Sequence, residues 1–432
     1  MKKRTLIIGL TLLILISFSI QAQEVKSVQE LFEALKTHPQ TKGDVLASEK
    51  ATTGKQLAFS NLFPTITAYT SFDNYSVPAA MLPVTPNGSS YMVQNQEIPQ
   101  PFSDQIFRAG VSISMPVFIK SIYTTASKAK HLQKSAQAKQ QLNLLQNEAI
   151  IVSSNANLLY LDALAKALES KKQSLLKTKE IINVKVENGR ASGASLLIIN
   201  NGIHQVEATK NEIAINREQA ISAIESLTGI RVNNAIQMLE TSTFKSDSIK
   251  SLEPLQQKVL ADKLAFRAEK EKLLPSIVLR GNYNYSAANA YNNDVSINTD
   301  FSTIGLVVSM PIFNKNQYTQ IKKSKLTYNA TVNELEKLEL SLKSQAIQLK
   351  NSLQLLYRSE ELYQQNIQDK EEILKISKAS YQSARISIED YLKYEDDLVL
   401  EKSKLYKAQA SKWQTLMKLA VIYGNNIENI VK

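Results

Sequence analysis

The most informative absence in this 432-residue sequence is cysteine. Without cysteine the chain has no disulfide, no thiolate metal site, no iron–sulfur cluster and no residue for a lipoprotein anchor. Three histidines, at positions 38, 131 and 204, leave little material for catalysis or metal binding. Glycine and proline are also scarce, at 12 and 11 residues, which argues against a large all-β soluble protein because turns depend on both.

Motifs that carry chemistry are equally thin. Lys and Arg outnumber Asp and Glu by 51 to 40, but the two signs are interspersed, which does not favour a nucleic-acid partner. There is no Gly-x-Ser-x-Gly elbow and no phosphate-binding loop. His204 and Glu207 have the spacing of half a metal site, yet no second pair matches them, which favours a solvated helical face. We therefore expect that the protein is not an enzyme and that it binds no cofactor or metal.

The first 22 residues are typical of a secretory signal. A basic start at residues 2–4 precedes an apolar run from Leu6 to Ile20, and Ala22 is a small residue at the cleavage point. This run of 15 residues is shorter than the ~20 needed to span a bilayer, so an uncleaved membrane anchor is the weaker alternative. The mature chain is expected to be exported.

Internal repetition organises the rest of the chain. Residues 110–118, Gly-Val-Ser-Ile-Ser-Met-Pro-Val-Phe, return as residues 305–313, Gly-Leu-Val-Val-Ser-Met-Pro-Ile-Phe, an offset of 195. The same offset carries Arg190 onto Arg385, Ser192 onto Ser387 and Gly229 onto Gly424. A second landmark, at 62–66 and 273–277, is offset by 211, so the first repeat holds 16 extra residues. They fall in a proline-rich stretch between Tyr75 and Phe107 that is typical of a loop, expected outside the cell.

Each repeat carries the pattern of two membrane strands. In the first strand of the second repeat, five residues at every second position share one face of the strand, and polar residues lie on the opposite face. The shared face holds Ile277, Leu279, Gly281, Tyr283 and Tyr285, and the opposite face holds Arg280, Asn282 and Asn284. Segments of ~10 residues have the length of a tilted membrane strand. Two strands are too few for a sheet of their own, which disfavours a soluble sandwich in each repeat.

Very long helices follow each strand pair. No Gly or Pro interrupts residues 120–187 or 315–382, so each stretch predicts a helix of 68 residues, ~100 Å long. Apolar residues at steps of four and three predict a coiled-coil seam, with polar interruptions at Glu360 and Lys370 in the second copy. Asn188-Gly189 gives a helix stop, after which the chain resumes as helix.

These patterns predict five segments. They are a signal peptide at 1–22, a first repeat at 23–230, a connector at 231–252, a second repeat at 253–424 and a short tail at 425–432. The first repeat is expected to hold a helix, a strand pair at 65–76 and 105–118, and a helical hairpin at 120–229. The second is expected to hold a helix, strands at 276–286 and 300–313, and a hairpin at 315–424.

This ordered, duplicated set resembles the TolC-like outer membrane efflux protein family. The resemblance extends from residues 27–40 through both proline-marked strand starts, both Gly-x-x-x-Ser-Met-Pro-x-Phe returns and both hairpins. It implies a mainly α fold with membrane β structure. Long antiparallel coiled-coil helices would form a periplasmic tunnel, and four strands per chain would contribute to a trimeric, twelve-stranded outer-membrane β-barrel.

The resemblance also implies a function. The chain would form the outer-membrane exit duct of a tripartite efflux or type I secretion system in a Gram-negative bacterium, as a passive homotrimeric channel in contact with outer-membrane lipid. Its partners would be a periplasmic membrane-fusion adaptor and an energised inner-membrane transporter of the RND or ABC class. The alternative is a secreted or periplasmic coiled-coil structural or adaptor protein. An adaptor normally has one hairpin per chain, and a structural coiled coil needs no alternating aromatic strands.

In the family the hairpin turns form the periplasmic mouth, where the adaptor docks. The matching tip residues here are Gly189, Arg190, Ser192, Arg385 and Ser387. Acidic side chains just after the second turn close the mouth in the family. Glu389 and Asp390 stand there in this sequence, followed one turn later by Lys393.

Two interpretations of this segment are compatible. Ser387 with Asp390 three residues on also fits a helix N-cap with a favourable charge at the positive end of the helix. Lys393 stands where another acid is expected, and Ser195 replaces the acid in the first repeat. A purely acidic gate is therefore not expected.

Overall fold

The structure is a computed structural model that describes residues 26–81, 87, 90–91, 94–241, 247–383 and 385–432. The expected signal peptide lies outside these residues. The chain divides into two compact units, and each takes segments from both halves of the sequence. The sheet unit comprises residues 47–138 and 253–337. The helical unit comprises the described parts of 1–46, 139–252 and 338–432.

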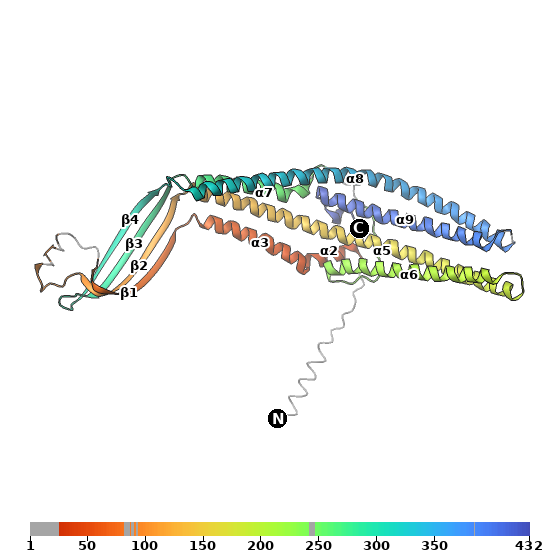
Figure 1. Ribbon diagram of the computed structural model, residues 1–432, viewed down its shortest axis with the longest axis horizontal. Coiled ribbons are helices and arrows are strands. Elements are labelled where there is room, and N and C mark those ends of the chain that lie inside the picture. The colour runs from red at the N-terminus through yellow and green to blue at the C-terminus, as the bar shows by residue number, and fades with distance from the viewer. Residues whose placement is uncertain (1–25, 82–86, 88–89, 92–93, 242–246, 384) are drawn as a thin grey trace, which may run out of the picture. The chain divides into compact units, whose positions relative to one another are not determined.

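The sheet unit contains one antiparallel sheet with strand order β1-β2-β3-β4 (Figure 1). Its strands are β1 (Thr65–Ala80), β2 (Phe102–Phe118), β3 (Ser276–Asn289) and β4 (Ser296–Ser309). Strands β1 and β2 come from the first repeat, and β3 and β4 come from the second. The two strand pairs are joined where β2 pairs with β3, from Ile106 opposite Ala288 to Phe118 opposite Ile277. Among the described residues, neither β1 nor β4 pairs with a further strand on its outer edge.

Strand β1 runs to Ala80 and contains Pro78, within the stretch that the sequence indicates as a loop. Proline has no backbone N–H, so it is normally excluded from the interior of a ladder. Here the register with β2 shifts between Asn74 and Ala79, which places Pro78 in an irregular segment where no regular pairing is needed. Strand β4 ends at Ser309, two residues before Pro311.

The far end of the first loop is docked onto the turn between β3 and β4. The Asn292 side chain donates hydrogen bonds to the carbonyls of Gln96 (2.9 Å) and Ile98 (3.0 Å). Its oxygen accepts from the Gln100 backbone N–H at 3.1 Å. The Tyr291 hydroxyl donates to the Gln100 side chain at 2.9 Å. The end of this loop is therefore held by specific contacts, while Gly88 and Ser89 lie outside the described residues.

Four helices contribute to the sheet unit through parts or all of their length: α3 (Pro39–Ser60), α5 (Lys120–Glu187), α7 (Glu253–Glu271) and α8 (Lys315–Gln382). Polar contacts between side chains hold them together. His131 of α5 lies 2.9 Å from Gln257 of α7, and Gln133 of α5 donates to Thr52 of α3 at 3.0 Å. Thr331 of α8 donates to Asp262 of α7 at 2.8 Å.

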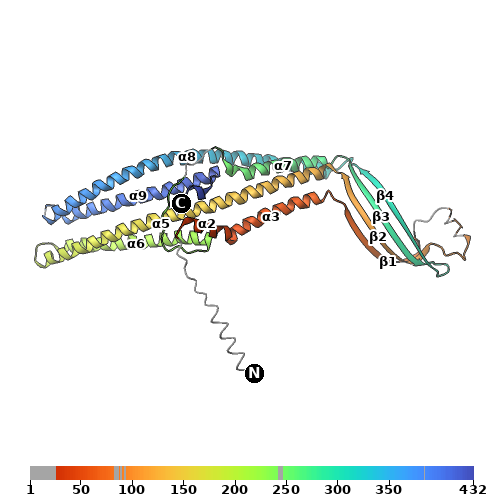
Figure 2. The ribbon, with the colours of Figure 1, turned by 180° about the vertical axis from the view of Figure 1, so that it is seen from behind.

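The helical unit places four helices in the order α8, α9, α5 and α6 (Figures 1 and 2). The additional helices are α6 (Gly193–Thr228) and α9 (Ile388–Tyr423). Ion pairs link successive neighbours. Lys370 of α8 pairs with Asp397 of α9 at 2.8 Å, Lys171 of α5 pairs with Asp396 of α9, and Arg217 of α6 pairs with Asp162 of α5 at 2.9 Å. The polar interruption at Lys370 is thus a contact between helices.

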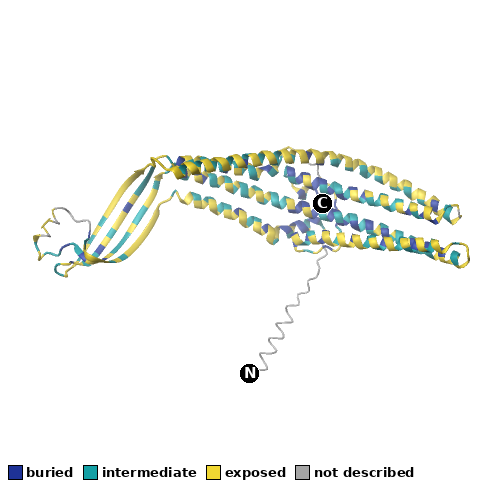
Figure 3. Cartoon of the chain, in the orientation of Figure 1, coloured by how far each residue is buried: buried dark blue, intermediate teal, exposed yellow. Residues whose placement is uncertain are grey.

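The largest buried cluster lies around the middle of α5 in the helical unit, where buried residues gather in Figure 3. It joins α5 to α2 (Val28–Thr37), to the ends of α6 and α9, to the connector after α6 and to the tail near η2 (Ile427–Asn429). The fully buried Asn155 donates to the carbonyl of Ile236 at 2.7 Å and accepts from its N–H at 2.9 Å. The connector and tail pair in turn through Leu239 and Lys432, at 2.7 and 3.0 Å.

The last helix of each repeat ends in the same way, at a glycine. Gly229 after α6 has φ +71°, and Gly424 after α9 has φ +66°, and both are C-caps in the left-handed region. A side chain at either position would strain the backbone, because L-residues rarely adopt such angles. The correspondence found in the sequence at an offset of 195 therefore has a structural cause.

A buried carboxyl group lies in this core. Glu148 of α5 is 3 % exposed, and burial, with the negative charge of Glu428 second, raises its pKa to about 7. Lys36 lowers that pKa again, although Lys36 is itself paired with Glu428 at 2.8 Å and Glu33 at 2.7 Å. Since the native pKa lies above the ordinary value of 4.5, the group favours folding at acid pH.

We predict that Glu148→Gln stabilises the helical unit at pH 8 by up to about 3 kcal/mol, because a shift of one pKa unit is worth 1.36 kcal/mol. The stabilisation should shrink as the pH falls through 7 toward 4.5, where the native glutamic acid is already neutral. Thermal unfolding followed by circular dichroism between pH 5 and 8 measures this. A variant whose advantage over the parent stays constant with pH would contradict the assignment.

Candidate functional site

The two faces of the sheet differ in polarity over the rows nearest the helices. Residues directly opposite one another on neighbouring strands point to the same face. One row is Ile66, Ile113, Gly281 and Ile304, and the next row, on the other face, is Thr67, Ser112, Asn282 and Thr303. The apolar face is exposed in the single chain, with Ile304 82 % and Ile66 66 % accessible. The alternation of apolar and polar residues that the sequence predicted in the strands therefore corresponds to the two faces of the sheet in these rows.

Charged and hydrogen-bonding side chains lie on the polar face. Arg108 of β2 pairs with Asp73 of β1 at 2.5 Å, and its guanidinium also donates to the Tyr75 hydroxyl at 2.7 Å. The Tyr69 hydroxyl donates to Asn284 of β3, so its ring spans β2. Gly110 allows this, because a Cβ there would lie 2.8 Å from the Tyr69 ring. The polar face is therefore a hydrogen-bonded surface suited to contact with water.

The tips of the two helical hairpins meet in the helical unit. The α5–α6 tip and the α8–α9 tip share a small apolar cluster that includes Ile182, Ile199, Ile388 and Tyr391. Gly189 ends α5 with φ +69°, and Ser192 stands at the N-cap of α6 without a side-chain capping bond. The two sets of tip residues are therefore brought together within one chain.

The second tip contains a complete capping box. Ser387 accepts a hydrogen bond from the Asp390 N–H at 3.0 Å, and the Asp390 carboxylate accepts one from the Ser387 N–H at 3.3 Å. The N-cap interpretation is confirmed. Arg190, Arg385, Glu389 and Lys393 are all exposed, and among the described residues none of them forms an ion pair in the single chain. Ala384 lies outside the described residues.

A polar cluster behind the tips ties the first hairpin to the second. The buried carboxylate of Glu395 accepts from the Tyr391 hydroxyl at 2.6 Å and from the Ser174 hydroxyl of α5. Burial, with Glu395 second, raises the pKa of Tyr391 to about 12, which keeps this phenol a donor. The Tyr391 ring stacks on Tyr381 at 5.5 Å, and the Lys185 ammonium of α5 lies 5.1 Å from the Tyr381 ring centre.

Sequence reasoning missed this cluster. Ser174 and Glu395 are 221 residues apart, so no local spacing connects them. The only local signal is the i, i+4 spacing of Tyr391 and Glu395, which is common on helices.

The described residues include no group of three or more His, Asp or Glu side chains that could hold a metal ion. Glu207, considered above with His204, instead pairs with Lys172 of α5. No helix within the described residues is long and apolar enough to cross a membrane.

This fold, an open four-stranded sheet with paired long helices, is that of outer-membrane channels. The outer-membrane channel CmeC of Campylobacter jejuni is 16 % identical, with a TM-score of 0.77 over 94 % of this chain and 90 % of that one. The outer membrane protein VceC of Vibrio cholerae is 16 % identical, with a TM-score of 0.76 over 92 % and 96 %. The MtrE channel of Neisseria gonorrhoeae, in its open state, is 15 % identical, with a TM-score of 0.72 over 94 % and 90 %.

Residues 251–425 match the model of the family of outer membrane efflux proteins. No protein among those with curated functions matches the sequence. The resemblance to TolC-like efflux proteins is therefore confirmed by sequence in the second repeat and by fold along the chain. The matched family consists of efflux proteins and not of enzymes.

The alternation of faces predicts opposite effects of neighbouring substitutions in β2. Val111→Arg places a charge on the apolar face, whereas Ser112→Arg places it on the polar face. A lipid-facing arginine costs up to ~2–4 kcal/mol per chain, so Val111→Arg should deplete the assembled protein in the outer membrane while Ser112→Arg does not. Immunoblots of fractionated membranes measure both, and equal tolerance of the two variants would contradict a lipid-facing apolar face.

Proposed function

We propose that this chain is one protomer of a passive, trimeric outer-membrane exit duct of a tripartite efflux or type I secretion system. A periplasmic membrane-fusion adaptor and an energised inner-membrane transporter of the RND or ABC class would complete the system. The observation that carries the proposal is the four-stranded sheet, with one apolar face, one polar face and two open edges. The fold shared with outer-membrane channels supports it.

The open edges require partner strands. In hydrocarbon every backbone N–H and C=O needs a hydrogen bond, so an apolar sheet is stable in lipid only as part of a closed barrel. Four strands cannot close a barrel by themselves. Pairing of β1 with β4 of the next chain would satisfy both edges, and three copies would place twelve strands around a polar lumen. The polar face, with Arg108, Asp73 and Asn282, would line it.

The helices support the same assembly. In the helical unit α8 and α6 are the outermost of the four helices, with α9 and α5 between them (Figures 1 and 2). Both carry exposed apolar side chains: Leu340 (70 %) and Ile347 (62 %) on α8, and Leu197 (70 %) and Ile215 (62 %) on α6. The seven-residue step from Leu340 to Ile347 is that of a coiled-coil seam. Packing of α8 on α6 of the next chain would cover both stripes.

The alternative is a secreted or periplasmic coiled-coil structural or adaptor protein. Such a protein has no use for an exposed apolar sheet face, which in water would promote aggregation. Cell fractionation distinguishes the two hypotheses. An exit duct is recovered with the outer membrane, whereas a structural protein is recovered with the soluble fraction.

A cysteine pair provides a direct test of barrel closure, since the parent chain has no cysteine background. Thr67→Cys in β1 is combined in turn with a cysteine at successive positions of β4, including Thr303→Cys. We expect disulfide-linked dimers and trimers when the β4 cysteine stands opposite position 67 of the next chain, and also at nearby β4 positions on the same face. Non-reducing electrophoresis of outer membranes measures them.

The matched control combines Thr67→Cys with Asn282→Cys in β3. Both residues lie on the polar face, but β3 has its neighbours β2 and β4 within its own chain. This pair should form no link between chains. Absence of intermolecular disulfides at every β4 position would exclude the proposed edge pairing.

The hairpin tips are the proposed periplasmic mouth and adaptor-docking end. Docking would involve Gly189, Arg190, Ser192, Arg385 and Ser387. In a trimer Arg190 and Arg385 would place six positive charges around the mouth, near three copies each of Glu389, Asp390 and Lys393. Since these side chains form no ion pair with any residue that the structure describes, pairs between neighbouring hairpins would be available to hold the mouth closed.

We predict that Arg385→Ala with Asp390→Ala raises single-channel conductance in planar bilayers. Each exposed pair is worth only ~0.2–1 kcal/mol, but three symmetry-related copies act on one mouth. Ser387→Ala is the control, because it removes the capping hydroxyl and leaves both charges. If the double variant forms intact trimers and conducts like the wild type, the gate is refuted and Asp390 has only its role in capping the helix.

A further inference from the structure

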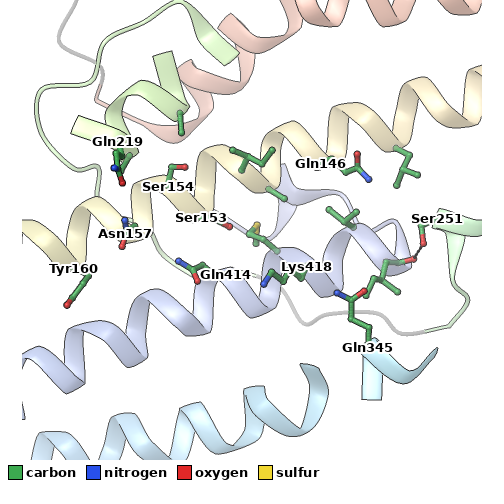
Figure 4. A pocket seen from close by; sticks show the side chains of 18 of the residues that line it. Gln146, Ser153, Ser154, Asn157, Tyr160, Gln219, Ser251, Gln345, Gln414 and Lys418 are labelled. Carbon is green, nitrogen blue, oxygen red and sulfur yellow. Dashed lines mark hydrogen bonds between the residues drawn. The ribbon is translucent and has the colours of Figure 1, made fainter. Parts of the chain in front are cut away.

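A groove of about 920 Å³ runs along the helical unit, on the side of α5 away from the connector (Figure 4). Helices α5, α6, α8 and α9 all contribute to its walls. Ser153 and Asn157 face it from α5, whereas Asn155 between them points to the connector and is hydrogen-bonded to Ile236. The volume is sufficient for a drug-sized molecule.

The groove has an apolar floor and an amide-rich rim. Its apolar lining includes Ala149, Leu161, Leu342 and Met417. Six of the lining residues carry side-chain amides: Gln146, Asn157, Asn216, Gln219, Gln345 and Gln414. Amides both donate and accept hydrogen bonds, so they match hydroxyl, amide and carbonyl groups on a ligand without requiring one orientation.

Only one of the 22 lining residues is charged. Lys418 of α9 lies with Gln414 between α9 and α5 in Figure 4. Lys418 is exposed, and among the described residues no carboxylate forms an ion pair with it. Elsewhere in the helical unit lysines commonly pair with acids across the helices, for example Lys370 with Asp397 and Lys412 with Glu360. An unpaired cation beside an apolar floor attracts an anion.

We propose that this groove binds amphipathic organic anions, molecules with an apolar body and one anionic group, as they pass through the duct. The apolar body lies on the floor formed by α5 and α9, and the anionic group binds the Lys418 ammonium. The position inside the duct rests on the proposed function, because the groove faces a lumen only when three chains surround it. Binding itself requires the helical unit alone.

Two dyes of nearly the same shape test the inference. The anion 8-anilinonaphthalene-1-sulfonate and neutral N-phenyl-1-naphthylamine share their ring system and differ by the sulfonate. Both are titrated into the full-length protein in a neutral detergent, with detergent blanks subtracted. Trp413 is the only tryptophan of the chain and adjoins Gln414 in α9, so energy transfer from Trp413 reports a dye bound near this part of α9. Trp413 itself lines a neighbouring cavity, and loss of the transfer in Ser153→Phe assigns the dye to the groove.

Three variants separate charge from shape. Lys418→Gln should weaken sulfonate binding about tenfold, as expected for loss of a charge-assisted contact, and change the affinity for the neutral dye by less than about twofold. Lys407→Gln, an exposed lysine of α9 that does not line the groove, should leave both affinities unchanged. Ser153→Phe fills the groove and should weaken both dyes about tenfold.

Equal effects of Lys418→Gln and Lys407→Gln would overturn the inference, as would full binding to Ser153→Phe or no energy transfer from Trp413. The Thr67→Cys crosslink with β4 is scored in parallel. Crosslinked trimers that do not bind the dyes refute the groove and leave the exit duct standing. Dye binding with the variant pattern above, but without crosslinks, supports the groove and refutes the duct.

Discussion

The constraint on which this structure depends is the unsatisfied edge of a membrane sheet. Strands β1 and β4 each present a row of backbone groups that pair with no further strand in the described part of the chain, and the sheet has one apolar face. Water can satisfy such groups, but hydrocarbon cannot. In hydrocarbon a sheet of this size needs partner strands, and the proposed trimer would supply them. The same assembly would cover the exposed apolar side chains of α6 and α8.

The helical unit meets a different requirement, because its surfaces must stay soluble while its helices keep their register. The largest apolar cluster lies around the middle of α5, and smaller apolar clusters lie farther along the hairpins and at their tips. Charged pairs also join neighbouring helices. The Glu360 and Lys370 interruptions of the predicted seam are such contacts, with Glu360 3.0 Å from Lys412. Each pair contributes little stability, but opposite charges at fixed spacing disfavour a shifted register.

Charged side chains are distributed unevenly over the helical unit. At the hairpin tips Arg190, Arg385, Glu389 and Lys393 are exposed and form no ion pair with any described residue. Among the described residues that line the groove along α5, only Lys418 carries a charge. Behind the tips, one oxygen of the buried Glu395 carboxylate accepts hydrogen bonds from Tyr391 and from Ser174 of α5, which links one hairpin to the other. The described part of the helical unit thus combines ion pairs and hydrogen bonds between its helices with exposed charges at its tips.

The sequence alone was sufficient for the features that depend on neighbouring residues. Alternation in β3 identified its two faces, the long stretches without Gly or Pro predicted helices, and Ser387 with Asp390 predicted a capping box. Tertiary structure decided the rest: the β2–β3 register that joins the two repeats, the burial that shifts the pKa of Glu148, the contact between Ser174 and Glu395, and the groove at Lys418. These features bring together residues from distant parts of the chain, and periodicity reports only which side of its own helix or strand a residue occupies.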